Sequence, residues 1–287
     1  MYKSLILIIL TSGVVNAEKL SFEQQLNLST DRISALDIIS GAGDINISIH
    51  DSNEILVNAT ITSDKYRSME RFKEVYERDM VFRMDRESEF AVLRGHSKPD
   101  LRKNPEIQIH LNIQIPKHLD VDIEDGSGAI YVTGLAGRLQ IEDGSGAIEI
   151  SNHSNSLDIE DGSGAISLTK IQGTIQIEDG SGPIKITDSD GDVEIGDGSG
   201  DIHLSGVNGN KQIEDSSGDI TIENGSGDVD IDDGSGDIRL SNISGSAVIN
   251  DGSGSIYIDS LSGSLKIKNA GSGQVIIDGE NRTKEFK

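Results

Sequence analysis

Hydrophobic positions recur along most of this chain with a period of 18 residues. From Asp125 onward, eight successive units follow the form Asp-Gly-Ser-Gly-x-Ile-x-aliphatic, with Ser216 in place of the first glycine in one unit, then a loop, a turn residue that is nearly always glycine, and a closing x-Ile pair. The position five residues after each registering aspartate is always isoleucine: Ile130, Ile148, Ile166, Ile184, Ile202, Ile220, Ile238 and Ile256. Apolar and polar residues alternate around these isoleucines, which is typical of half-buried β-strands. Each unit therefore predicts two short strands.

A fixed period of this kind indicates a repeat architecture, and 18 residues are too few for a propeller blade. Two strands and two corners per unit predict one coil of a flattened, parallel β-solenoid, so the fold class is all-β. Stacked strands lie about 4.8 Å apart, and each isoleucine should lie over its equivalent in the next coil. Lys211 and Ala247 fall in an otherwise aliphatic inward column, so both are expected to be weak points.

The two corners of each coil carry different turn residues. The Asp-Gly-Ser-Gly corner offers two glycines and an aspartate that can accept hydrogen bonds from its own downstream amides. The second corner has glycine in every unit except one, which has Asn155. Because asparagine tolerates the left-handed region, this exchange predicts a positive φ at that position.

The segments that flank the repeats define the remaining organisation. Residues 1–17 resemble a secretory signal peptide, with Lys3 before an apolar run and Val15-Asn16-Ala17 as the cleavage site. Residues 18–124 are expected to form irregular first coils, interrupted by a capping insert over 63–105 that contains a helix near 68–78 and a hairpin. Residues 125–268 are the eight regular repeats, and 269–287 supply a last strand and a cap.

Composition narrows the functional classes. The chain has 287 residues, a formal charge of −24 and no cysteine, which excludes disulfides, thiolate metal sites and a cysteine nucleophile. The strong negative charge argues against binding nucleic acid or an anionic membrane. No segment after the signal is apolar for long enough to form a transmembrane helix, so a soluble protein of the periplasm or the cell surface is expected.

The repeated corner, together with the lead-in from Ile115 to Val121 (Ile-Pro-Lys-His-Leu-Asp-Val), resembles a bacterial family of unknown function. Its members are β-strand-repeat proteins labelled "putative adhesins". The resemblance covers roughly residues 30–278, apart from the insert. It implies a β-helix-like fold in an exported protein, and it supplies no catalytic residues.

The acidic residues gather in the repeats, where residues 121–268 hold 28 acidic and 7 basic side chains. Equivalent charges about 4.8 Å apart repel by roughly 0.9 kcal/mol even in water. Hydrogen bonds from corner amides and screening by salt are one offset; calcium bound between coils is the other. The candidate calcium ligands are Asp188, Asp190, Asp192, Asp215, Asp233 and Asp237.

Catalytic patterns are weak in this sequence. The six histidines show no triad or metal-ligand spacing, and the Gly-Ser-Gly corner lacks the Gly-x-Ser-x-Gly form of a nucleophile elbow. We therefore expect a non-catalytic, acidic, rigid protein with an adhesin-like or envelope-scaffold role, and an envelope or surface protein or a glycan as its partner. A calcium-binding repeat module and, more distantly, a glycan-active enzyme remain the alternatives.

Overall fold

The structure is a computed structural model that describes residues 19–99, 101 and 103–286. The predicted signal segment, 1–17, lies outside these residues. The chain forms two compact units, Met1–Gly146 and Ala147–Lys287, and the division falls within the repeats. Neither of the two described helices has the length and apolar character that a membrane crossing requires.

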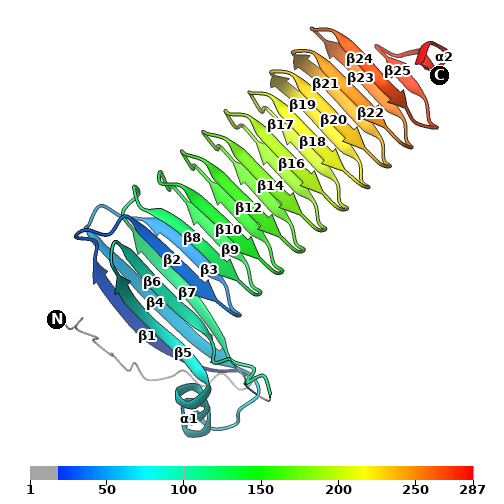
Figure 1. The fold of residues 1–287 in the computed structure, drawn as a ribbon. Helices are drawn as coiled ribbons and strands as arrows, with labels where there is room; N and C mark the ends of the chain where they lie inside the picture. Colours follow the sequence, from blue (N-terminus) through cyan, green and yellow to red (C-terminus); the bar gives the residue numbers. More distant parts are fainter. Residues whose placement is uncertain (1–18, 100, 102, 287) are drawn as a thin grey trace. The chain divides into compact units, whose positions relative to one another are not determined.

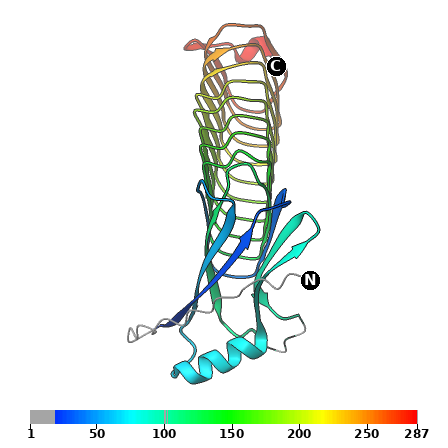
Figure 2. The same ribbon diagram turned by 90° about the vertical axis from the view of Figure 1, so that its left-hand side faces the viewer.

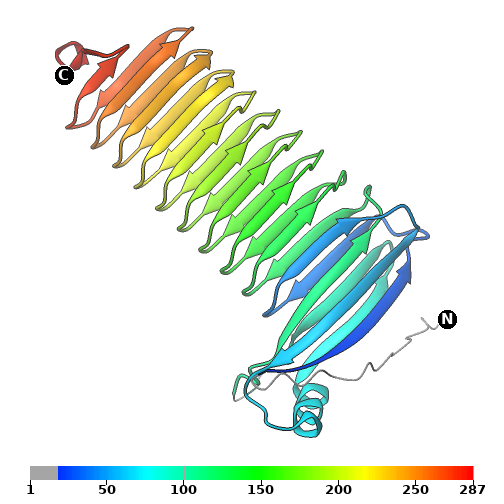
Figure 3. The same cartoon turned by 180° about the vertical axis from the view of Figure 1, so that it is seen from behind.

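The second unit is a parallel β-solenoid, which confirms the predicted fold class (Figures 1 and 3). Its strands form two sheets, which we call sheet A and sheet B, and every coil contributes one strand to each. Sheet A consists of β11 (Ile148–Ser151), β13 (Ile166–Thr169), β15 (Ile184–Thr187), β17 (Ile202–Ser205), β19 (Ile220–Ser226), β21 (Ile238–Ser244), β23 (Ile256–Leu261), β25 (Val275–Ile277) and β26 (Glu280–Asn281). Sheet B consists of β12 (Leu157–Asp161), β14 (Ile175–Asp179), β16 (Val193–Asp197), β18 (Lys211–Asp215), β20 (Val229–Asp233), β22 (Ala247–Asp251) and β24 (Leu265–Ala270).

Equivalent residues of successive coils pair in register. Ile148 lies opposite Ile166, and Ile166 lies opposite Ile184. The structure buries all eight repeat isoleucines, each 0 or 1 % exposed. A further inward column, which the sequence analysis did not identify, fills the second corner and includes Ile171, Val207 and Ile243. The interior is thus a set of aliphatic columns that run across the strands.

Four glycines of this column, Gly173, Gly191, Gly209 and Gly227, have positive φ, but Asn155 does not, because in its coil the left-handed residue lies three positions earlier. Asn152, Asn224 and Asn242 have φ values between 53° and 56°. The glycine column itself is required by a close approach between coils. At Gly245, whose φ is not in the left-handed region, an added Cβ would lie 2.1 Å from the carbonyl oxygen of Gly227 in the preceding coil.

The first unit contains both parallel rungs and antiparallel strands. β2 (Ala35–Ser40) pairs in parallel with β8 (Asp120–Asp125), and β8 with β10 (Leu139–Asp143). β3 (Ile45–Ile49) pairs in parallel with both β7 (Gln108–Ile115) and β9 (Ile130–Thr133). These strands continue the coil pattern, as expected. The expectation of coils throughout residues 20–62 is wrong, however, because β1 (Leu20–Ser29) and β4 (Glu54–Ser63) are antiparallel to each other and β4 is antiparallel to β7.

The insert has the helix and hairpin that the sequence predicts. The helix α1 (Met69–Asp79) begins after Ser68, whose hydroxyl accepts the amide of Arg71 as an N-cap. The hairpin strands β5 (Met80–Glu87) and β6 (Phe90–Ser97) follow, and β6 joins β2 in parallel. Figure 2 shows α1 below the strands of the first unit.

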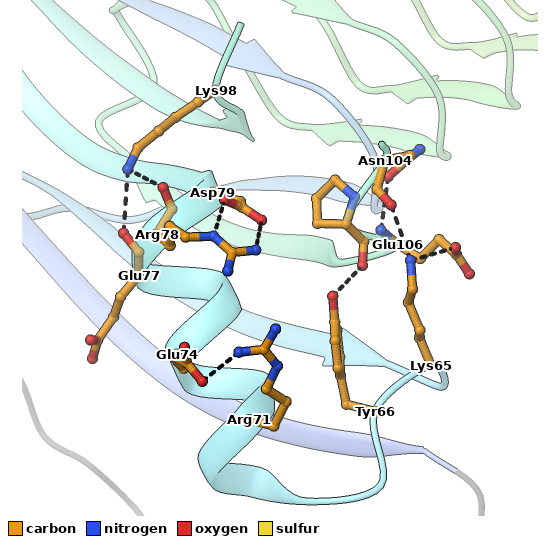
Figure 4. A network of polar contacts seen from close by, with 11 residues as sticks. Lys65, Tyr66, Arg71, Glu74, Glu77, Arg78, Asp79, Lys98, Asn104 and Glu106 are labelled. Carbon is orange, nitrogen blue, oxygen red and sulfur yellow. Dashed lines mark hydrogen bonds and ion pairs between the residues drawn. The ribbon is translucent and has the colours of Figure 1, made fainter. Parts of the chain in front are cut away.

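Aromatic and polar contacts hold α1 in place. Phe22 of β1 packs edge-on against Phe72 and Tyr76 of the helix, with ring centroids 5.2 and 5.1 Å apart. Figure 4 shows the polar network around α1, in which Tyr66 donates to the carbonyl of Pro105 (2.9 Å) and Lys65 pairs with Glu106 (2.7 Å). The helix therefore seals hydrophobic side chains of β1.

The C-terminal end departs from the repeat. The strand register shifts by one residue where β22 meets β24, at Ile249/Asn250, as the extra residue in 269–273 predicts. β24 is an edge strand of sheet B and carries the exposed Lys266 and Lys268. Charged side chains on an edge oppose pairing with another chain. The short helix α2 (Thr283–Phe286) follows β26.

We expect Gly245→Ala to destabilise the protein by about 1–3 kcal/mol, because its Cβ would overlap a backbone carbonyl that in-register stacking fixes. The control is Gly196→Ala, whose Cβ would meet only the movable carboxylate of Glu178, 2.5 Å away. That change should stay within about 0.5 kcal/mol. Urea unfolding followed by circular dichroism measures both, and equal effects would contradict the close-approach explanation.

Candidate functional site: a column of buried aspartates

The registering aspartates end the strands of sheet B with their side chains inside the coil. In each case one carboxylate oxygen, Oδ1, accepts the backbone amide of the serine two residues later. The amide-to-Oδ1 distances are 3.0 Å at Asp161, Asp179, Asp197 and Asp233, 2.9 Å at Asp215 and 2.8 Å at Asp251. This is the local amide bonding that the sequence predicts, and it fixes the Asp-Gly-Ser-Gly turn.

These six residues, which we call the Asp column, lie in register from coil to coil. Asp161 pairs with Asp179, and the pairing continues to Asp251. All are buried, with exposed fractions from 0 to 6 %. The column thus places one carboxyl group in the interior for every coil.

The second carboxylate oxygen, Oδ2, has a different environment. Among the described residues, Oδ2 is buried without a hydrogen-bond partner in Asp161, Asp179, Asp197, Asp215 and Asp233. Burial, partly offset by the corner amides, raises the pKa of Asp179, Asp197 and Asp215 to about 6. Burial and repulsion by Asp215 and Asp251 raise the pKa of Asp233 to about 7. An ionised carboxylate here lacks much of the solvation that it has in water.

Sequence reasoning treated these aspartates as turn residues and did not place them in the interior. The alternation of inward and outward residues along the strand would have predicted their inward position. Ile159 points inward, so Asp161, two residues later on the same strand, must point inward as well.

Other acidic residues bond to the neighbouring coil from outside. Asp192 Oδ1 accepts the amide of Asn210 (2.8 Å), 18 residues on, and Asn210 Oδ1 accepts that of Asp228 (3.1 Å). Asp219 and Asp237 extend a second ladder of this kind. These bonds tie a charged side chain to an amide of the next coil and offset part of the repulsion within each column.

The six candidate calcium ligands are distributed over several columns. Asp215 and Asp233 belong to the Asp column, whereas Asp192 and Asp237 belong to the two outer ladders. Asp190 accepts a bond from the side chain of Asn208 (2.8 Å), and Asp188 occupies a left-handed corner position with φ of 52°. In the part of the chain that the structure describes, no three His, Asp or Glu side chains gather as a metal site would require. Calcium binding therefore stays a prediction, and the candidate ligands do not surround one common point.

We expect millimolar CaCl2 to shift the melting temperature of the full chain no more than an equal concentration of MgCl2 does. The reason is that Ca²⁺ requires about six to eight oxygen ligands around one point. Differential scanning calorimetry after chelator treatment measures the shift. A rise in melting temperature that occurs with calcium and not with magnesium would contradict this expectation and support the calcium-binding alternative.

One histidine lies beside an aspartate and a threonine in an arrangement that resembles a catalytic triad. The spacing of these residues in the sequence did not reveal it. His110 lies 3.2 Å from Asp44 Oδ2 through Nδ1 and 3.4 Å from Thr62 Oγ1 through Nε2. The backbone amide of Asp44, however, donates to the same Nδ1 at 3.1 Å. A neutral ring that accepts at Nδ1 carries its proton on Nε2, so it cannot take the proton of Thr62. The arrangement is consistent with a structural hydrogen-bond network.

Lys211 is the charged residue in the aliphatic column of sheet B, and it is 2 % exposed. Its Nζ donates to the carbonyls of Gly209 (2.9 Å) and Ser226 (2.6 Å). A Cβ at Gly225 would lie 3.3 Å from Nζ, so this glycine leaves room for the lysine. Burial lowers the pKa of Lys211 to about 8, with Asp192 acting in the opposite direction.

This depressed pKa predicts an alkaline effect on stability. The folded chain disfavours the charged lysine, so the penalty is present below about pH 8 and is relieved between about pH 8 and 10.5. Relative to Lys211→Met, the wild type should gain about 1–3 kcal/mol over that range. Denaturant unfolding at several pH values tests this. The exposed Lys185→Met is the control, and a constant difference between wild type and Lys211→Met would contradict the prediction.

Comparisons with known proteins give only remote similarity. Neither a protein-family model nor a curated protein matches the chain. One similar solved structure is a "putative cell adhesion protein" from Clostridium sporogenes, with 10 % identity and a TM-score of 0.29, covering 74 % of this chain and 98 % of that one. Another is a "putative adhesin" from Parabacteroides merdae, with 12 % identity and a TM-score of 0.30, covering 89 % and 95 %. At these scores neither similarity carries an argument about this chain.

Proposed function

We propose that this chain is a non-catalytic, exported β-solenoid protein that serves in adhesion or as a scaffold of the cell envelope. The proposal rests on the hydrogen bonds that the repeated polar residues make within the stack. Asp192, Asn210 and Asp219 bond to amides of the next coil, and the Asp column fixes the turns. The repeat therefore serves to maintain a stacked scaffold, whose outer sheet faces remain available for binding.

The outer face of sheet B is the surface that best suits a partner. Two outward columns on this sheet carry side chains that are mostly acidic, and we call these side chains the acidic face: Asp158, Glu160, Glu178, Glu194, Glu214, Asp230 and Asp232. Lys266 continues the first column on the last strand, and Lys268 of the same strand lies 3.7 Å from the carboxylate of Asp230. Such a field attracts a partner with clustered lysine or arginine and repels anionic polymers.

The acidic face is also hollowed at Gly196. Gly196 interrupts the glutamate column, and the carboxylate of Glu178 bends over it. Glu178, Gly196 and Glu214 line a shallow concavity there. A basic side chain that enters this hollow would approach two carboxylates at once.

The test compares adhesion of cells that lack the chain with adhesion of cells that carry defined variants. We expect the wild type to restore attachment and Glu178→Gln/Glu194→Gln/Glu214→Gln to restore much less, since it removes three charges from the acidic face. The control removes three exposed charges from the first unit, as Glu70→Gln/Glu77→Gln/Glu89→Gln, and should behave as wild type. Attachment should weaken as salt rises, because exposed charges are screened beyond about 8 Å at physiological ionic strength.

Two results would contradict the proposal. One is equal attachment with and without the chain when fractionation shows the mature protein in the cytoplasm. The other is saturable hydrolysis of a glycan by the purified chain, which would favour the glycan-active alternative.

A further inference from the structure

The Asp column has a geometry that its role in the turns does not require. Oδ1 alone holds the serine amide, and this bond fixes the corner. Oδ2 of Asp179, Asp197 and Asp215 faces the interior without a partner among the described residues. Because adjacent strands lie about 4.8 Å apart, these oxygens form a file of closely spaced acceptors.

The surroundings of the column offer no compensating positive charge. Across the core, β13, β15, β17, β19 and β21 contribute isoleucine, leucine and Gly225 to the interior and no charged side chain. The corner residues Asp201 and Asp219 act on Asp215 and Asp233, and they are acidic as well. On the other face of the same strands, Glu160, Glu178, Glu214 and Asp232 point outward.

The remaining ionisable groups of the interior lie elsewhere in the coil. Lys211 begins β18, whereas Asp215 ends it, about 13 Å away along the strand. The ammonium group of Lys211 donates hydrogen bonds to the carbonyls of Gly209 and Ser226. His153 fills the second corner, where its Nε2 contacts the carbonyl of Ser156 at 3.2 Å. Neither residue neutralises the column.

The missing partner is better supplied by protons than by metal ions. A proton binds one oxygen of a single carboxylate and removes its charge, so each aspartate of the column can take one up without a second ligand. A calcium ion needs about six to eight oxygens around one point, and a file of single oxygens does not surround a point. A neutral carboxyl group is far less costly to bury without a partner than an ionised one, so protonation relieves the burial of Oδ2.

We infer that the Asp column is a proton-binding site of the solenoid: its buried aspartates take up protons in mild acid, and the second unit becomes more stable there. This goes beyond the proposed adhesive role, because it assigns a response to the pH of the compartment. Ordinary surface carboxylates give the opposite trend, since their ion pairs are lost in acid.

The sign of the effect follows from the pKa values of the column. The pKa of these carboxyl groups is about 6 to 7 in the folded chain, against an ordinary value of 3.8. The folded state therefore binds more protons than the unfolded state between these limits. The stabilisation is fully present below about pH 4 and is lost as the pH rises through about 6 to 7.

The test measures thermal unfolding of the full chain from about pH 4.5 to 8, together with the carboxyl ¹³C titration of labelled aspartate. The variants are Asp197→Asn and Asp215→Asn, which keep Oδ1 as the acceptor for serine and supply an amide donor in place of Oδ2. The matched control is Glu194→Gln, which removes an exposed charge from the same strand as Asp197.

We expect the wild-type melting temperature to rise by about 5 °C or more from about pH 7.5 to 5. Asp197→Asn and Asp215→Asn should raise the melting temperature at the higher pH and flatten this dependence, and Glu194→Gln should parallel the wild type. A set of aspartate signals should titrate near the raised values in the wild type, even if a variant fails to fold. The inference is overturned if all aspartates titrate together near their ordinary pKa, or if the asparagine variants keep the wild-type pH slope.

Discussion

In-register stacking of equivalent residues is the constraint on which the rest of this structure depends. Because each strand pairs with its equivalent 18 residues on, every side chain lies about 4.8 Å from its equivalent in the next coil, and in the interior the two are mostly alike. For isoleucine this is favourable, since the interior columns exclude water. For aspartate it is costly unless each carboxylate finds a donor. The protein meets this demand with amides of the same turn, amides of the next coil and, as inferred above, proton uptake by the buried carboxyl groups.

The same constraint explains the exceptions within the repeat. Lys211 lies in an aliphatic column, and Gly225 leaves space for its ammonium group. The carbonyls of Gly209 and Ser226 accept hydrogen bonds from that group. At the second corner, every coil except that of Asn155 has a glycine, where an added Cβ would overlap the backbone of the preceding coil. Each irregular residue is thus accommodated by its neighbours in the stack, and a substitution at one position has its consequences in an adjacent coil.

Much of the second unit could be predicted from the sequence, because strand alternation and the 18-residue period act locally and repeat. The sequence did not reveal the antiparallel pairing of β1 and β4, since these strands also alternate and their partners are set by long-range contacts. It placed the positive φ at Asn155 instead of Asn152, because both flank the same turn. The buried position of the Asp column was available from alternation, yet an aspartate beside glycine also matches an exposed turn.

The most direct test of stacking is to delete whole or partial coils from the full chain. Removal of Gly198–Asp215, one complete 18-residue unit, joins Asp197 to Ser216, which then takes the corner position that Gly198 holds in the intact chain. We predict that this deletion keeps the β-sheet circular dichroism spectrum and cooperative unfolding. Removal of nine residues, 198–206, should abolish both, because it moves inward residues out of their columns. Equal tolerance of the two deletions would contradict in-register stacking.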